Sequence, residues 1–264
     1  LLLHSINAAA GAHEVRPLFA HYCGSRVVYA PDLPGYGHSE RSDRDYTPRL
    51  MTDAVLDMVD LIRREHGDVP VDALGVSLTS EFLSRAGNER PAAFRSLALV
   101  SPTALNRATP RRGETGATRG IPWLSRNLQR PWLGKGLFKA LSSPGSVRFF
   151  LRKTWGSKQI DETMFEYACL TARQPGARYA PFYFLSGYLF SADAFGLYES
   201  LGQPVWMCHG VRGDFTDYRL KDQLLANKNW QCQVFDSGAL PYFEVPDDFI
   251  KAYGGFLAAI QEQD

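Results

Sequence analysis

The sequence lacks any apolar run that approaches the ~20 residues of a membrane-spanning helix, so we predict no such span. It has almost no net charge, since 29 Lys and Arg face 28 Asp and Glu, which argues against a dedicated nucleic-acid-binding protein. Internal repeats and low-complexity tracts are also missing. The remaining composition, 264 residues of which 45% are hydrophobic, suffices to bury a core without a disulfide or a metal. We therefore expect one sizeable globular domain that can carry an inserted subdomain.

Cysteine is scarce and widely spaced. The four cysteines, Cys23, Cys169, Cys208 and Cys232, form no Cys-x-x-Cys pair, which argues against a zinc or redox motif. Cys208 and Cys232 lie in apolar, strand-like segments and are expected to be small core residues. This usage predicts a reducing, cytoplasmic location, and we expect neither a metal nor a cofactor.

Short apolar runs alternate with amphipathic segments along most of the chain. Strands are predicted over residues 1–4, 26–30, 69–76, 97–100, 205–208 and 231–235. Helices are predicted over residues 13–23, 47–66 and 78–86, and a last one begins near Pro246. Such alternation predicts an α/β fold in which helices cover both faces of a mostly parallel, doubly wound sheet.

Residues 103–195 break this rhythm. They contain Trp123, Trp132 and Trp155 and an aromatic stretch at 182–190, and they show no β-type alternation. We therefore predict a helical cap insertion here, whose aromatic side chains would wall an apolar pocket. The core would then comprise residues 1–102 and 196–264.

Ser77 lies directly between a predicted strand and a predicted helix. Gly75, two residues earlier, permits a sharp turn that would expose the serine hydroxyl, as in the nucleophile elbow Gly-x-Ser-x-Gly. Thr79 replaces the last glycine of that pattern, which is tolerable if the helix packs slightly further from the neighbouring strand. The alternative is a serine that simply caps the helix.

The chain resembles the α/β-hydrolase superfamily over nearly its whole length. The resemblance is carried by the following segments: His4-Ser5-Ile6, the loop from Asp32 to Ser39, Ser101-Pro102, His209-Gly210 through Asp214, and Phe235 through Pro246. The family implies that the first two strands, an antiparallel start, lie before residue 1. It also places a cap domain where residues 103–195 stand.

The resemblance implies a role for several residues. Ser77 would be the nucleophile, and the backbone N–H groups of Leu78 and Ile6 would form the oxyanion hole. Asp214 is the candidate acid of the triad. Asp217 is the alternative, because the spacing from His209-Gly210 to Asp214 is one residue longer than in the family pattern. Either aspartate could instead cap a helix.

The sequence departs from the family at residue 239. The family has Gly-His in this turn, whereas this chain has Gly238-Ala239 and no histidine after His209. A serine hydroxyl is a weak nucleophile without a base, so Ser77 and its acid would lack the group that connects them. Three explanations stay open: an introduced alanine, a natural non-hydrolytic protein, or another base. His4 and His38 are the candidates for that base, although the family uses the equivalent of His4 structurally.

Charge is distributed unevenly along the chain. Residues 106–158 contain 12 basic residues and one acid, Glu114, whereas the remainder has 17 basic and 27 acidic residues. With the interleaved aromatics, this basic cap could face an anionic membrane surface or an anionic substrate, or it could dock on the acidic core. No nucleic-acid recognition motif is present.

Two functional interpretations follow. The first is a serine esterase-like or thioesterase-like acyl hydrolase that acts on a small hydrophobic ester-like ligand with an incomplete triad. The second is a non-catalytic ligand-binding pseudoenzyme of the same fold. The elbow favours the enzyme and Ala239 favours the pseudoenzyme, and fold analogy inclines us to the enzyme.

Overall fold

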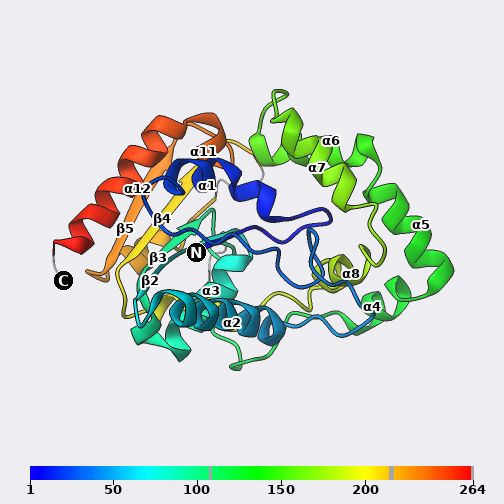
Figure 1. Ribbon diagram of the computed structural model, residues 1–264. Helices are drawn as coiled ribbons and strands as arrows, with labels where there is room; N and C mark the ends of the chain where they lie inside the picture. The colour runs from blue at the N-terminus through cyan, green and yellow to red at the C-terminus, as the bar shows by residue number, and fades with distance from the viewer. Residues whose placement is uncertain (107–108, 214–216, 263–264) are drawn as a thin grey trace.

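A parallel sheet of five strands organises the computed structural model, which describes residues 1–106, 109–213 and 217–262 (Figure 1). The strands are β1 (Leu2–Leu3), β2 (Val71–Val76), β3 (Phe94–Val100), β4 (Val205–Gly210) and β5 (Trp230–Phe235). Their order in space equals their order in the chain, and each neighbouring pair is parallel. The prediction of an α/β fold with a mostly parallel sheet is confirmed.

Side chains of successive strand residues point to opposite faces of the sheet and enter two separate cores. In β3, Leu97 and Leu99 pack into one core, and Ala98 and Val100 pack into the other. The first core is closed by α2 (Pro48–His66) and α3 (Thr79–Glu89). The second is closed by α1 (Arg16–Tyr22) and α12 (Pro246–Gln261), which lie across the sheet from α2 and α3 in Figure 1. Burial on both faces explains why these strands read as continuous apolar runs.

Local signals set the ends of the predicted helices. Thr47 caps α2, because its side-chain oxygen accepts a hydrogen bond of 3.1 Å from the Leu50 N–H. Gly67, with a φ of 86°, ends the same helix in a conformation that favours glycine. Shorter elements complete the core: the 3₁₀ helices Ala12–Val15 (η1) and Pro91–Ala93 (η2), α10 (Lys221–Leu225) and α11 (Pro241–Glu244).

The strand predicted over residues 26–30 does not form. Its one strand-like backbone bond among the described residues is accepted by the Tyr29 carbonyl from the Leu2 N–H at 2.8 Å. Its other side has no strand among the described residues, and Val27 is 63% exposed. A single backbone hydrogen bond to β1, which has only two residues, does not define a strand. The apolar pattern of residues 26–30 is nevertheless typical of a strand.

The insertion predicted over residues 103–195 is helical in the structure. Between β3 and β4 the chain forms α4 (Pro122–Leu128), α5 (Pro131–Leu141), α6 (Pro144–Trp155), α7 (Glu162–Thr171), α8 (Tyr179–Leu185) and α9 (Ala194–Glu199). Figure 1 shows α4 to α8 to one side of the sheet, opposite the C-terminus. Throughout the described residues, each helix is too short or too polar to cross a membrane.

A buried ion pair joins the insertion to the core. Arg85, on α3, donates to the Asp193 carboxylate at 2.8 Å, just before α9. Each side chain is 9% exposed, and Arg85 also reaches the Ser191 hydroxyl at 3.5 Å. Removing one partner of a buried pair leaves an uncompensated charge, so this contact is sensitive to mutation.

We expect Arg85→Ala to lower the free energy of unfolding by roughly 3–5 kcal/mol, because it leaves Asp193 charged and buried. Arg90→Ala is the matched control, since the Arg90–Asp60 pair is exposed and such pairs contribute less than about 1 kcal/mol. Urea unfolding of both variants measures the difference. Equal losses would show that the Arg85 pair does not hold the insertion to α3.

Candidate active site

The turn between β2 and α3 holds Ser77 in a strained conformation. Its φ is 55°, in the left-handed region that serine rarely adopts. The Ser77 N–H donates to the Val100 carbonyl at 2.8 Å, which ties the turn to the end of β3. A Cβ at Gly75 would lie 3.2 Å from Leu83 Cδ2 and 3.3 Å from the Thr79 carbonyl oxygen, so the helix passes close to the strand. This is the geometry of an elbow rather than of an ordinary N-cap.

Thr79 fits the elbow in place of glycine because its hydroxyl has a specific partner. The side chain is fully buried, and its Oγ1 donates to the His4 carbonyl at 2.6 Å. The hydroxyl therefore connects the start of α3 to the chain that follows β1. Thr79 therefore stabilises the elbow, although it replaces the last glycine of Gly-x-Ser-x-Gly.

The loop after β1 is organised by Glu14, which sequence reasoning missed. Glu14 is buried, and its carboxylate accepts from the Ser5 N–H at 2.7 Å and from Asn7 Nδ2 at 2.9 Å. Ile6 lies between these two anchored residues. Among the described residues, the backbone N–H groups of Ile6 and Leu78 have no hydrogen-bond acceptor. Donors that lack an acceptor are available to an anionic oxygen, so these two N–H groups remain candidates for the predicted oxyanion hole.

His4 is engaged by the backbone at both ring nitrogens. Its Nε2 accepts from the Leu33 N–H at 2.9 Å, which assigns the proton to Nδ1, and Nδ1 donates to the Ser5 carbonyl at 2.6 Å. The ring is fully buried. His4 would have to break one of these bonds to accept a proton from Ser77, so its geometry is that of a structural histidine. His38, the other candidate base, is exposed and lies edge-on to Tyr167.

The turn that carries Ala239 meets the end of β3 and the end of α6. Ser101 Oγ donates to the Ala239 carbonyl at 2.7 Å, and the Ala239 N–H donates to the Thr154 carbonyl at 2.9 Å. Because Val100 precedes Ser101 and accepts from Ser77, one short segment contacts both the elbow and this turn. The buried Ala239 is thus held on the same sheet edge as Ser77, without an imidazole.

Glu244 also stabilises the turn that carries Ala239. Its carboxylate accepts from the Gly238 N–H at 2.6 Å and from Arg212 at 2.8 Å. A Cβ at Gly238 would lie 2.4 Å from the Trp155 carbonyl oxygen, so only glycine allows α6 to approach this closely. The insertion therefore packs directly on the turn where the family carries its histidine.

Of the two candidate acids, Asp214 and Asp217, the structure describes only Asp217. Asp214 lies outside the described residues. Asp217 is exposed, and its carboxylate pairs with Arg219 at 2.8 Å. The structure therefore places Asp217 at the surface in an ion pair, and nothing it describes connects this carboxylate to Ala239.

His209, at the end of β4, is also fully occupied. Its Nδ1 bonds the Gly210 carbonyl at 2.9 Å, its Nε2 lies 3.1 Å from Lys221 Nζ, and Tyr218 stacks on the ring at 4.0 Å. Burial, aided by Lys221, lowers the pKa of His209 below its ordinary value. A neutral, stacked imidazole that accepts from a lysine stabilises the strand end.

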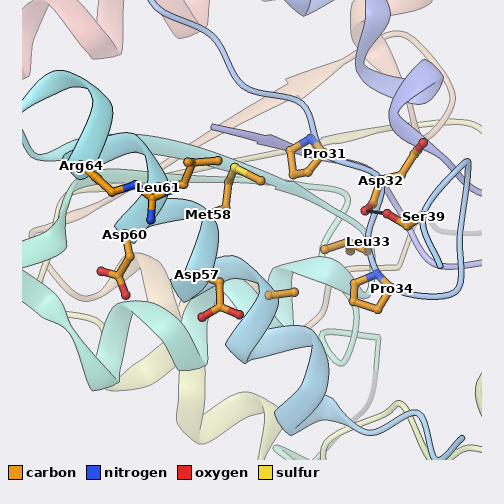
Figure 2. Close-up of a pocket in the computed structure, with 11 residues that line it drawn as sticks. Pro31, Asp32, Leu33, Pro34, Ser39, Asp57, Met58, Asp60, Leu61 and Arg64 are labelled. Carbon is orange, nitrogen blue, oxygen red and sulfur yellow. Dashed lines mark hydrogen bonds between the residues drawn. The ribbon is translucent and has the colours of Figure 1, made fainter.

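Three cavities stand out among the described residues, and none of them is lined by Ser77. The first lies between a loop and α2, the second lies at the starts of β1 and β2, and the third lies between the insertion and the loop at 43–45. Figure 2 shows the first, about 510 Å³, between the loop of Pro31 to Ser39 and α2. Its Asp32 organises that loop, since the carboxylate accepts from the Ala12 and His38 N–H groups at 2.6 and 2.8 Å. The apolar pocket predicted over Ser77 is not among these cavities.

Metal binding finds no support in the side chains. Within residues 1–106, 109–213 and 217–262, no three His, Cys, Asp or Glu side chains are grouped so as to hold a metal ion.

The comparisons with known proteins agree with this geometry. The sequence profile described as "Alpha/beta hydrolase family" matches residues 1–252. The chain belongs to the alpha/beta hydrolase family. No curated protein sequence matches it.

Solved structures of hydrolases share the fold of this alpha/beta hydrolase. A 2-hydroxy-6-oxo-6-phenylhexa-2,4-dienoate hydrolase from Rhodococcus sp. strain RHA1 is 17% identical, with a TM-score of 0.73 over 97% of this chain and 89% of that one. A putative lipase from Acinetobacter baumannii AYE is 20% identical, with a TM-score of 0.71 over 100% and 84%. A thermophilic esterase from Thermogutta terrifontis is 16% identical, with a TM-score of 0.70 over 98% and 89%. At these identities the likeness concerns the fold.

A buried carboxyl group lies one helical turn beyond the turn of Ser77. Glu81 is fully buried, and it accepts from Thr103 Oγ1 at 2.5 Å and from the Ser191 N–H at 2.8 Å. Burial raises the pKa of Glu81 to about 7, although these hydrogen bonds act in the opposite direction. The residue connects α3 to the insertion, and the sequence shows no sign of its burial.

Glu81 predicts a pH dependence of stability. Its pKa rises from 4.5 in the unfolded chain to about 7 in the fold, so the native state binds more protons between these values. Its contribution is therefore full below about pH 4.5 and is lost as the pH rises through about 7, a loss of about 3 kcal/mol. Glu81→Gln should remove this slope, because the amide retains the shape and can bond both neighbours.

Urea unfolding at about pH 5 and about pH 8 measures the effect. The exposed Glu89 provides the matched control, since Glu89→Gln should leave the slope of the parent protein unchanged. A Glu81→Gln variant with the same pH dependence as the parent would contradict the assignment.

Proposed function

We propose that the protein is a serine-dependent acyl hydrolase, esterase-like or thioesterase-like, that acts on a small hydrophobic ester-like ligand. The observation that carries the proposal is the left-handed Ser77, with φ 55°, together with the Ile6 and Leu78 backbone N–H groups, which have no acceptor among the described residues. A strained nucleophile turn is expensive to maintain and typically occurs at functional sites. Membership of the alpha/beta hydrolase family supports hydrolytic chemistry.

The proposed mechanism lacks one component. Ser77 would attack the acyl carbon, and the Ile6 and Leu78 N–H groups would stabilise the oxygen that becomes negative. The proton of Ser77 has no imidazole to receive it at residue 239, and the rings of His4 and His209 are held by other bonds. General-base assistance is worth about 10²–10⁴-fold, so turnover should be slow by that factor.

Ala239 also favours a second function, that of a ligand-binding pseudoenzyme. Ala239 is 6% exposed and is bonded on both sides, by Ser101 and Thr154, into a well-formed turn. A chain that retains the turn but lacks the base also suits a ligand-binding pseudoenzyme, in which Ser77 would contact the ligand without reacting. The two functions differ in whether the serine hydroxyl is activated.

Ala239→His tests the missing base. We expect hydrolysis of an activated ester such as p-nitrophenyl acetate to rise by roughly 10²–10⁴-fold, because the imidazole would take the proton of Ser77. Ala239→Asn is the matched control, since asparagine adds a polar side chain of similar reach that is not a base. The gain should vanish when Ser77→Ala is added to Ala239→His. A folded Ala239→His variant that is no faster than Ala239→Asn would contradict the proposed geometry.

A serine-directed fluorophosphonate distinguishes the enzyme from the pseudoenzyme. If Ser77 is activated by its turn and by the oxyanion donors, the unmodified protein should be labelled slowly and Ser77→Ala should not be labelled. Mass spectrometry of the labelled peptide identifies the residue. No labelling over hours, in a protein that unfolds cooperatively, would support the pseudoenzyme.

A further inference from the structure

Helix α5 presents large apolar side chains to solvent. Over residues 132–141 of this helix, whose burial the structure describes, only Gly134 and Phe138 are buried, and they contact α4 and α8. Trp132 is 75% exposed, and Leu133 and Leu137 are 37% and 39% exposed. A helix that buries so narrow a stripe leaves most of its apolar surface uncovered by the part of the chain that the structure describes.

The neighbouring helices extend this surface. Trp123 of α4 is 64% exposed, and Phe149 and Phe150 of α6 are 54% and 48% exposed. Figure 1 shows α5 at the outer margin of the molecule, beyond α4 and α6 as seen from the sheet. Single exposed apolar residues are ordinary, but several on three consecutive helices indicate an interaction surface.

Basic residues accompany the apolar ones. Lys135 and Lys139 lie on α5. Arg126 lies on α4, and Arg130 directly precedes α5. All four side chains are exposed. Among the described residues none of the four pairs with a carboxylate, unlike Arg148, whose guanidinium binds Glu162 at 2.6 and 2.7 Å. The segment of residues 106–158, to which these helices belong, has 12 basic residues and one acid, and these four exposed cations give its surface here a positive charge.

Cationic side chains also line a hollow beside α5. It measures about 500 Å³ and is lined by residues of α4, α5 and α8 and of the loop at 43–45. Its cationic side chains are Arg44, Arg130, Lys135 and Arg178, and its carboxylates are Asp43 and Asp45. One carboxylate is engaged, because the Tyr183 hydroxyl donates to Asp45 at 2.5 Å. The hollow therefore offers a net positive recess, of a size that suits a phosphate-bearing headgroup.

We propose that the outer face of α4, α5 and α6 binds an anionic lipid bilayer. Exposed tryptophan, leucine and phenylalanine would enter the headgroup–acyl boundary, while the Lys and Arg ends would meet lipid phosphates. A second copy of the chain fits less well, because a symmetric contact would bring two strongly positive surfaces together. A nucleic acid would leave the apolar side chains without a matching surface.

Flotation of the full chain with phosphatidylcholine vesicles, with and without about a third of phosphatidylglycerol, tests the proposal. We expect binding to the anionic vesicles only, and a strong decrease between about 0.05 M and about 0.5 M salt as the Debye length shortens. Equal binding to both vesicles, or no binding at low salt, would overturn it.

Two sets of variants separate the contributions of charge and apolar surface. Lys135→Glu with Lys139→Glu should weaken vesicle binding by roughly tenfold or more. The matched control is Lys228→Glu with Lys251→Glu, two exposed lysines outside the surface, which should bind much as the parent does. If the two double variants bind alike, the proposal fails.

Trp132→Ser with Leu137→Ser removes exposed side chains but retains Gly134 and Phe138, so the packing of α5 should persist. We expect at least a fivefold loss of vesicle binding, and circular dichroism and sedimentation should match the parent. If binding is unchanged, the apolar part of the proposal is wrong. If the parent self-associates without binding vesicles and this variant is a monomer, the surface joins two copies of the chain and the proposal is overturned.

Discussion

The left-handed backbone at Ser77 is the constraint around which this edge of the sheet is arranged. A non-glycine residue in this conformation costs of order 1–3 kcal/mol and persists only where its surroundings determine it. Here the Ser77 N–H is held by the Val100 carbonyl, and the next helix is held by the bond from Thr79 to the His4 carbonyl. Val100 ends β3, His4 directly follows β1, and both residues are fully buried, so the strain is sustained by the core and not by an exposed loop.

The insertion reaches this edge through two kinds of contact. One is the backbone bond between Ala239 and Thr154 at the end of α6, which a glycine at 238 makes sterically possible. The other consists of buried polar groups on α3, where Glu81 accepts from the Ser191 N–H and Arg85 pairs with its own carboxylate partner. Because α3 begins at the elbow, the same helix that follows Ser77 also carries the buried contacts to the insertion.

The inner and outer sides of the insertion differ in chemistry. Toward the sheet it presents backbone carbonyls and buried polar partners, and toward solvent it presents tryptophan, leucine and lysine. The basic composition that suggested docking on the acidic core therefore resides largely on the solvent side, at residues such as Lys135 and Lys139. The side of the insertion that contacts the turn of Ala239 and the side proposed to bind a bilayer are therefore separate faces of one segment.

The sequence by itself determined the alternating fold, the helical insertion and the position of Ser77, because apolar period, capping residues and Gly75 act within a few residues. It also showed that residue 239 is alanine. The tertiary structure alone decided that Glu14 and Glu81 are buried, that both nitrogens of His4 are engaged, and that the predicted strand at 26–30 lacks a partner. Those properties depend on contacts between residues far apart in the chain, and no local pattern records which groups such contacts bring together.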